Sequence, residues 1–286
     1  MTTRARVAAG TVGALVAGGI AAAGAGRAAW ERESARAVGR LRAAATAARR
    51  LESETGSVSD LPVPPKPVRR YLRWAIPEGA EPVRLARIRW RGEFRMRPGA
   101  KWAPFSAYQE YSLRPPGFVW DARIHLFPGM TARVRDGYLA GAGTVSGRLG
   151  GVFPLAHAGG PPEIAQSALA RWLGEAVWFP TALLPGGAVT WQTIDDTSAR
   201  ALVVDCEVRA EGEFRFGPSG EVFSVRAIRF RDVGGQPVAT PFEGRFGSYT
   251  SNDGFHIPRE AEAAWLLEDG AFVYWRGRVA EVEYEG

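Results

Sequence analysis

The sequence predicts an α+β fold. In it, a strongly curved antiparallel sheet or open β-barrel wraps around one central amphipathic helix, behind an N-terminal helical region. Two observations lead to this prediction. Apolar and polar residues alternate along many short segments between residues 87 and 284, as they do in strands with one buried and one wet face. A single helical pattern at residues 162–178 interrupts these strands. A sheet that curves around a helix can hold an apolar ligand.

The first 25 residues have the order of an export signal or membrane anchor. Arg4 and Arg6 precede an uncharged run at residues 7–26, and Ala23 and Ala25 are small residues suited to signal peptidase. The run is long enough to span a bilayer, yet 14 of its 20 residues are Ala or Gly, which gain little from lipid. We predict an extracytoplasmic protein, secreted or in the cell envelope. Membrane anchoring through this run is the alternative, and a non-targeting helix is the third reading.

Residues 26–66 are predicted to form a helix and a proline-rich linker. Val38, Leu41 and Ala45 recur at three- and four-residue steps within a helix at 28–51. This apolar stripe has few large side chains, so we expect a stalk or a loosely packed helix. The following stretch is polar and then rich in proline, which is typical of a linker. The β-rich domain, with helix 162–178 inside it, is therefore placed at residues 67–286.

Strand patterns cover most of this domain. A short helix is predicted after Pro67, and the first strand follows at residues 86–95. There Ile88, Trp90 and Phe94 point to one face, while the charged residues point to the other. The remaining strands are predicted at 102–112, 117–126, 131–140, 142–149, 188–194, 200–210, 212–216, 221–231, 242–250, 262–267 and 271–284.

Charge and motifs exclude several classes of function. Residues 1–85 hold 14 Lys and Arg against 7 Asp and Glu, whereas residues 86–286 hold 22 against 23. The β-rich part is thus about neutral, so no nucleic-acid partner is predicted. His125, His157 and His256 are far apart, and phosphate-loop and serine-hydrolase motifs are absent from the sequence. We predict no metal, no cofactor and no catalytic residue.

The alternation along two strands predicts whether three further side chains are buried or solvated. Cys206 is the only cysteine, and it shares the apolar face of strand 200–210 with Val204 and Val208. A buried, inert thiol is therefore expected. Asp121 falls on the strand face opposite Trp120, and Asp205 on the face opposite Cys206, so we expect both to be solvated.

Five aromatic side chains are predicted to form the wall of a ligand cavity. The alternative is that they belong to an ordinary packed core. They are Trp90, Phe94, Trp120, Trp172 and Trp178. Glu175 lies at the edge of the apolar half of helix 162–178 and is predicted to face the same cavity. A carboxylate there could act as an acid or base. The simpler interpretation is an i,i+4 ion pair with Arg171.

Four segments resemble an uncharacterised bacterial domain-of-unknown-function family. They are LPVPPKPVRRYLRWAIPEG, RGEFRMRPGAKWAPFSAYQEYSLRPPGFVWDARI, LARWLGEAVWFPTALLP and PFEGRFGSYTSNDGFHIPREAEAAW, and the resemblance covers about residues 61–285. The family has no established activity, so it implies no catalytic residues. In architecture alone, the chain is also similar to LolA/LppX-type lipoprotein and lipid carriers, whose open β-barrel is closed by helices around an apolar cavity. The N-terminal helical region is not part of that carrier pattern.

Three functions follow from these predictions. The leading one is a non-enzymatic cell-envelope protein that binds a lipid or another apolar molecule. The second is an enzyme of unknown reaction that uses Glu175 as an acid or base. The third is a membrane-tethered structural or partner-binding protein, whose protein partner the sequence does not identify. A continuous apolar cavity favours the first, a carboxylate or histidine bonded to Glu175 the second, and a solid core the third.

Overall fold

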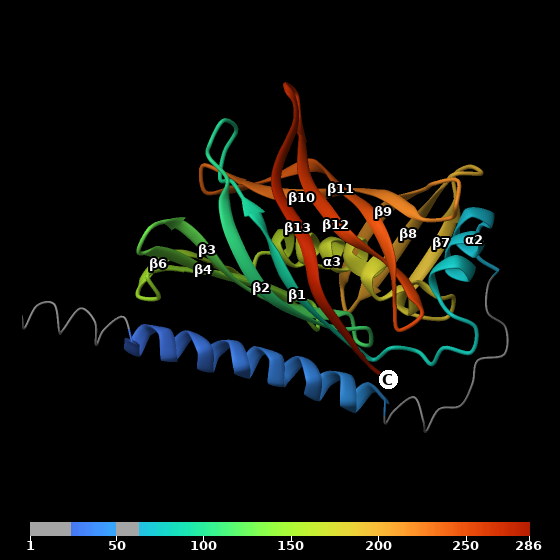
Figure 1. The fold of residues 1–286 in the computed structure, drawn as a ribbon, viewed down its shortest axis with the longest axis horizontal. Coiled ribbons are helices and arrows are strands. Elements are labelled where there is room, and N and C mark those ends of the chain that lie inside the picture. The colour runs from blue at the N-terminus through green and yellow to red at the C-terminus, as the bar shows by residue number, and fades with distance from the viewer. Residues whose placement is uncertain (1–23, 50–62) are drawn as a thin grey trace, which may run out of the picture.

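The structure, a computed structural model, describes residues 24–49 and 63–286, apart from the side chains of 156–158. Its main element is one strongly curved antiparallel sheet of 13 strands (Figure 1). The first six strands are β1 (Leu85–Phe94), β2 (Ala103–Ser112), β3 (Gly117–Phe127), β4 (Met130–Leu139), β5 (Ala142–Leu149) and β6 (Phe153–Gly159). The other seven are β7 (Val189–Thr193), β8 (Ser198–Asp205), β9 (Val208–Phe216), β10 (Val222–Val233), β11 (Gln236–Asn252), β12 (Phe255–Leu267) and β13 (Gly270–Glu285).

The sheet consists of two meanders joined at the middle. Its strand order is β6-β5-β4-β3-β2-β1-β13-β12-β11-β10-β9-β8-β7, so consecutive strands are neighbours except where β1 pairs with β13. The chain must therefore cross from edge strand β6 to edge strand β7. Helix α3 (Pro162–Glu175) and two short 3₁₀ helices, η1 (Ala176–Trp178) and η2 (Pro180–Leu183), make this crossing. The predicted helix at 162–178 thus ends in a 3₁₀ turn.

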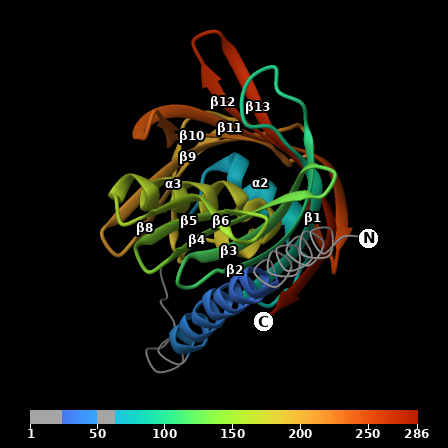
Figure 2. The same ribbon diagram turned by 90° about the vertical axis from the view of Figure 1, so that its left-hand side faces the viewer.

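Helix α3 lies on the concave side of the sheet (Figure 2). Its buried residues are Ala165, Ser167, Leu169, Ala170, Trp172 and Leu173. Ser167 and Ala170 lie opposite the predicted apolar half of the helix. They are buried because the curved sheet contacts α3 from several sides, through strands as far apart as β4, β5, β9 and β10. The predicted curved sheet around a central helix is therefore present, but burial is not confined to one helix face.

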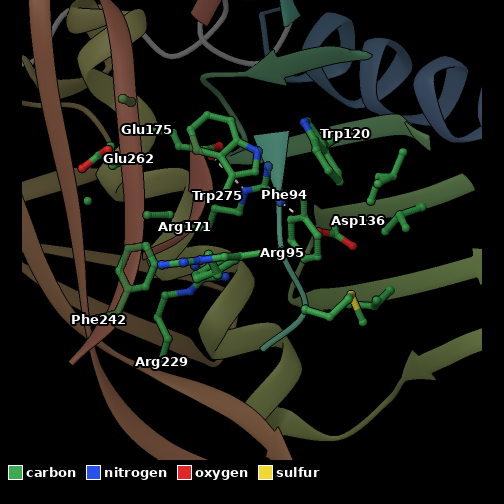
Figure 3. A pocket seen from close by; sticks show the side chains of 18 of the residues that line it. Phe94, Arg95, Trp120, Asp136, Arg171, Glu175, Arg229, Phe242, Glu262 and Trp275 are labelled. Atoms are coloured by element: carbon green, nitrogen blue, oxygen red, sulfur yellow. Dashed lines mark hydrogen bonds and ion pairs between the residues drawn. The ribbon is translucent and has the colours of Figure 1, made fainter. Parts of the chain in front are cut away.

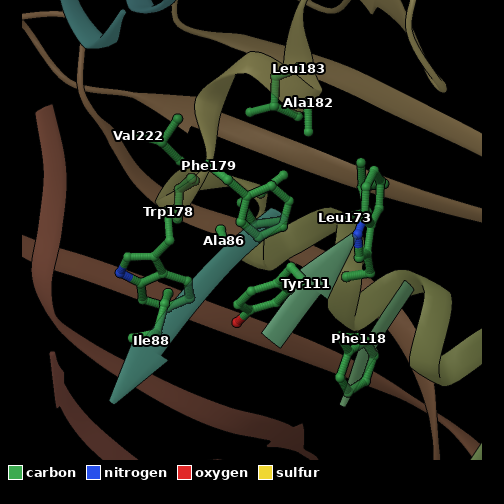
Figure 4. Close-up of a cluster of buried hydrophobic side chains, with 14 of the residues drawn as sticks. Ala86, Ile88, Tyr111, Phe118, Leu173, Trp178, Phe179, Ala182, Leu183 and Val222 are labelled. Carbon is green, nitrogen blue, oxygen red and sulfur yellow. The ribbon is translucent and has the colours of Figure 1, made fainter. Parts of the chain in front are cut away.

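A buried aromatic cluster joins α3 and the crossing segment to the sheet (Figure 4). Trp178, Phe179 and Leu183 are almost fully buried, and the ring of Phe179 packs at a tilt against that of Tyr111, with their centroids 4.5 Å apart. Helix α2 (Lys66–Ala75) covers the end of the sheet farthest from β6 and buries Tyr71 there. This helix matches the short one predicted after Pro67.

The two meanders also meet through a pair of hairpin turns. Asp205 Oδ2 accepts hydrogen bonds from the Tyr138 hydroxyl at 2.8 Å and from the Gly141 amide at 3.1 Å. Asp205 is therefore half-buried and bonded rather than freely solvated. The expectation for Cys206 is wrong as well, because it lies exposed in the turn between β8 and β9 with a φ of 54°. The buried face of β8 carries Ala201 and Val203, one residue out of phase with the predicted face.

A helix over residues 24–49 packs along the convex face of β2 to β5 (Figures 1 and 2). Trp30 is fully buried against the sheet, and its Nε1 donates to Asp121 Oδ2 at 2.9 Å. Arg42 Nη2 donates to Glu110 at 2.9 Å, and the Glu110 side chain has no solvent exposure. Asp121 is thus covered by the helix instead of solvated. The predicted apolar stripe of this helix has few large side chains, and Trp30 and ion pairs add to its contacts with the sheet.

Several expectations concern residues outside those described. The export signal or anchor at 1–25 falls there except for residues 24 and 25, and so does most of the predicted linker. Strand β6 was missed by the sequence reading, and one predicted turn, after residue 210, is instead at Cys206 and Glu207.

Candidate functional site

A cavity of about 650 Å³ lies between α3 and the concave face of the sheet (Figure 3). Its walls are mainly apolar side chains from strands of both meanders. Representative lining residues are Trp120, Ile124, Val134, Val225, Phe242 and Trp275. Two of the α3 residues that line it, Ala170 and Gly174, have little or no side chain. Larger side chains at these two positions would occupy part of that space.

The cavity opens to solvent at one end. There its lining includes Met96 from the β1–β2 loop, Leu126 at the end of β3 and Leu155 on β6. All three side chains are exposed, Met96 to 76%. The cavity is therefore accessible to a ligand from solution or from a surface placed against this end.

The structure places four of the six predicted site residues on the cavity wall. They are Phe94, Trp120, Glu175 and Trp178. Trp90 and Trp172 instead belong to the packed core next to it. Trp90 packs edge-on against Trp178 at 4.8 Å, and the fully buried Trp172 donates from Nε1 to the Ser112 carbonyl at 3.0 Å. That any of the six binds a ligand stays a prediction.

A charged cluster forms part of the wall. Arg171 donates from Nη1 to Asp136 and from Nε to Glu175, both at 2.9 Å. Glu175 Oε2 also accepts from Gln109 Nε2 at 2.9 Å and from the Tyr111 hydroxyl at 3.0 Å. The i,i+4 pair expected from the sequence is thus present, and it belongs to a larger network. One guanidinium joins two carboxylates, so Arg171 orients both.

Burial and charge oppose each other within this cluster. Burial raises the pKa of Asp136, although Arg171 and then Arg229 act in the opposite direction. Burial lowers the pKa of Arg171, but Glu175 and Asp136 outweigh it and hold that pKa above its ordinary value. Burial, and next the charge of Glu175, raise the pKa of Tyr111 well above its usual range. Tyr111 therefore remains a protonated donor to Glu175.

Sequence reasoning missed several residues of this site, above all Asp136 and Arg229. Asp136 did carry a signal, because it has the same strand phase as Ala132, Val134 and Tyr138. A carboxylate on the apolar face of a strand needs a buried partner. Arg229 carried no such signal. Its guanidinium lies 4.6 Å from the centre of the Phe242 ring, a contact that only the fold brings together.

The match to a known family covers most of the chain. Residues 63–284 match the Family of unknown function (DUF6920). The chain belongs to this family. The resemblance predicted for about residues 61–285 is therefore confirmed, and the cavity and its charged cluster lie within the matched region. A search of curated proteins found no match.

Solved structures that match this DUF6920 chain do so with low TM-scores and low sequence identity. One is a domain described as an outer membrane lipoprotein-sorting protein domain from Vibrio parahaemolyticus, with 8% identity, a TM-score of 0.37, and coverage of 77% of this chain and 89% of that chain. A LolA superfamily protein from Nitrosomonas europaea has 11% identity, a TM-score of 0.34, and coverage of 77% and 92%. A DUF1329 family protein from Desulfovibrio piger has 11% identity, a TM-score of 0.36, and coverage of 78% and 94%. Likeness at this level does not identify a ligand.

Two further properties hold for the described part of the chain. No group of three or more His, Cys, Asp or Glu residues within it is arranged to hold a metal ion. None of the helices in residues 24–49 and 63–286 is long and apolar enough to cross a membrane.

Proposed function

We propose that this protein binds a lipid or another amphiphile with an apolar chain, without catalysing a reaction, in the cell envelope. The observation that carries the proposal is the cavity of about 650 Å³ with apolar walls and one open end. Cavities that enclose small ligands commonly measure about 300–1,000 Å³. Each methylene group transferred from water into such a cavity contributes about 0.8 kcal/mol. A hydrocarbon chain is thus the ligand for which these walls are best suited.

The charged cluster suits a ligand that also has a polar end. Arg171, Asp136 and Glu175 lie on the wall beside the apolar residues, and Arg229 lines the same space. Polar groups placed in an apolar pocket fix the orientation of a ligand. We therefore propose that the apolar chain occupies the space lined by residues such as Ile124 and Val225. The polar group of the ligand would then lie near Arg171 and Arg229.

The alternative, an enzyme using Glu175, has less support in the geometry. Its carboxylate accepts hydrogen bonds from Arg171, Gln109 and Tyr111. A general acid or base must reach the proton it transfers. Here the second carboxylate, that of Asp136, is bridged to Glu175 through Arg171. We assign Glu175 the role of holding Arg171 in place.

Native mass spectrometry of the protein purified from its own host tests the proposal. The expected result is a bound species with the mass of a lipid, which is lost after extraction with organic solvent and refolding. A homogeneous protein without bound mass, from gentle purification as well as after incubation with host lipid extract, would contradict it. The export prediction is tested separately by a reporter fused after Gly286. A reporter active only in the cytoplasm would reject the envelope location.

A further inference from the structure

Large exposed apolar side chains lie at the open end of the cavity and on the turns next to it. We call five of them the mouth rim: Met96, Leu126, Phe127, Phe153 and Leu155. Their exposed fractions run from 39% for Leu126 to 76% for Met96. Three of them line the cavity itself. The two phenylalanines flank the neighbouring β3–β4 and β5–β6 turns, where the Gly150 amide donates to the Thr131 carbonyl at 2.9 Å. Clustered exposed apolar residues of this kind mark interaction surfaces.

Basic residues stand beside the mouth rim. The β1–β2 loop carries Arg95, Arg97 and Lys101, and the segment 94–102 contains no acidic residue. Arg95 and Lys101 line the open end of the cavity. Arg95 lies over the Trp102 ring at 4.5 Å, which holds its guanidinium beside the apolar residues. Apolar side chains bordered by cations are suited to a surface that is apolar inside and anionic at its boundary.

The N-terminal helix begins at the same end of the molecule (Figure 1). A Cβ atom on Gly26 would lie only 2.5 Å from the Gly151 carbonyl oxygen, so the first turn of the helix contacts the β5–β6 turn. The uncharged sequence at residues 7–26 therefore joins the described structure directly beside the mouth rim. If the run serves as an uncleaved anchor, it would place a membrane on this side.

We propose that the mouth rim docks on the surface of an anionic lipid bilayer, so that the cavity opens toward the acyl chains. The inference rests on the proposed function, because it supplies the route by which a lipid enters the cavity. Phe127 and Phe153 insert at the boundary between headgroups and chains, while Arg97 and Lys101 contact the headgroups. A lipid then moves into the cavity past Met96 without crossing bulk water.

Site-specific fluorescence on the full chain tests the docking. Cys206 is the only cysteine, so Cys206→Ser gives a cysteine-free background. Phe127→Cys and Phe153→Cys, made separately, each receive an environment-sensitive fluorophore. Phe223→Cys is the matched control, because Phe223 is an exposed phenylalanine near the start of β10. Gly220, just before this strand, packs against Arg70 of α2, at the end of the sheet farthest from β6. The vesicles contain equal parts phosphatidylcholine and phosphatidylglycerol, with a nitroxide quencher on the acyl chains.

The expected result is a blue shift and strong quenching of the labels at positions 127 and 153, with neither change at position 223. Arg97→Glu combined with Lys101→Glu should reduce the quenching to that seen on phosphatidylcholine alone. Labels at 127 and 153 that keep their aqueous emission, or equal quenching at 223, would overturn the proposal. Uptake of a fluorescent fatty acid by the same protein without vesicles is measured in parallel. A failure of docking is thereby distinguished from a failure of lipid binding.

Discussion

Arg171 Nη1 donates a hydrogen bond of 2.9 Å to Asp136 Oδ2 and so joins α3 to β4 across the cavity wall. The same guanidinium lies 5.0 Å from the centre of the Phe118 ring and 5.1 Å from that of Trp120. The desolvation of a buried charge is offset only if oppositely charged and hydrogen-bonding partners are well placed around it. Arg171 therefore fixes both the position of α3 inside the sheet and the polar end of the cavity.

Arg171→Met should lower the free energy of unfolding by about 3–5 kcal/mol at neutral pH, because it leaves two half-buried carboxylates without their cation. Urea unfolding followed by circular dichroism measures the change. Arg209→Met is the control, since Arg209 is 63% exposed and pairs with Glu211 at the surface. That control should cost about 0–1 kcal/mol. Equal losses in the two variants would show that the cluster does not hold α3.

The loss in Arg171→Met should depend on pH through Asp136. Burial raises the pKa of Asp136 above its ordinary value, so its charged form is less favourable in the folded protein than in the unfolded chain. Its contribution to stability is therefore fully present below the unfolded pKa of about 3.9 and is lost as the pH rises through the folded pKa. Without Arg171 the folded pKa rises further. The difference in stability between parent and variant should consequently shrink as the pH falls toward 4, measured by urea unfolding across that range.

Trp172 and Trp120 should respond differently to truncation. Trp172 is fully buried outside the cavity, so Trp172→Ala should cost about 3–5 kcal/mol, as in a close-packed core. Trp120 borders existing empty space, so Trp120→Ala should cost less and should alter the uptake of a fluorescent fatty acid. Unfolding and uptake are measured on both variants. A core-sized loss at both positions, with uptake unchanged at Trp120, would contradict the assignment of the wall.

The docking of the N-terminal helix should weaken in acid. Burial alone would raise the pKa of Glu33, but hydrogen bonds from Arg135 and Arg148 outweigh it and hold that pKa below its ordinary value. A lowered folded pKa contributes stability above the unfolded pKa of about 4.3, and this stability is lost as the pH falls through the folded value. Amide hydrogen exchange in residues 24–49 should therefore lose protection at acid pH before the strands do. Simultaneous loss in helix and sheet would argue against this view.

A chain that starts at Leu61 should fold without the N-terminal helix, because the matched family region begins at residue 63. It should nevertheless be less stable than a chain starting at residue 24, since it exposes Glu110 and Asp121 without Arg42 and Trp30. Comparing urea unfolding of the two chains measures the contribution of the helix. An insoluble shorter chain, beside a well-folded longer one, would place the helix within the core of the domain.

Local patterns predicted the strands well where one face is buried. The alternation around Ile88 and Trp90 matches β1, and the turn at 217–220 separates β9 from β10. The prediction failed at Cys206, because an apolar residue in a turn looks like part of the neighbouring strand. It also failed for Asp121, whose outward direction was right but whose partner, Trp30, lies 91 residues away. Contacts over such separations are set by the fold and leave no local periodicity.

Saturation binding of a fluorescent fatty acid to a cavity-filled variant tests the central claim most directly. Ala227 lines the cavity, whereas Ala239 is exposed on β11 outside it. The account predicts saturable binding by the parent and by Ala239→Trp, and binding at least about tenfold weaker by Ala227→Trp, equivalent to about 1.4 kcal/mol. Folded parent protein that shows no saturable binding, or equal affinity in all three proteins, would contradict the claim that this cavity is a ligand site.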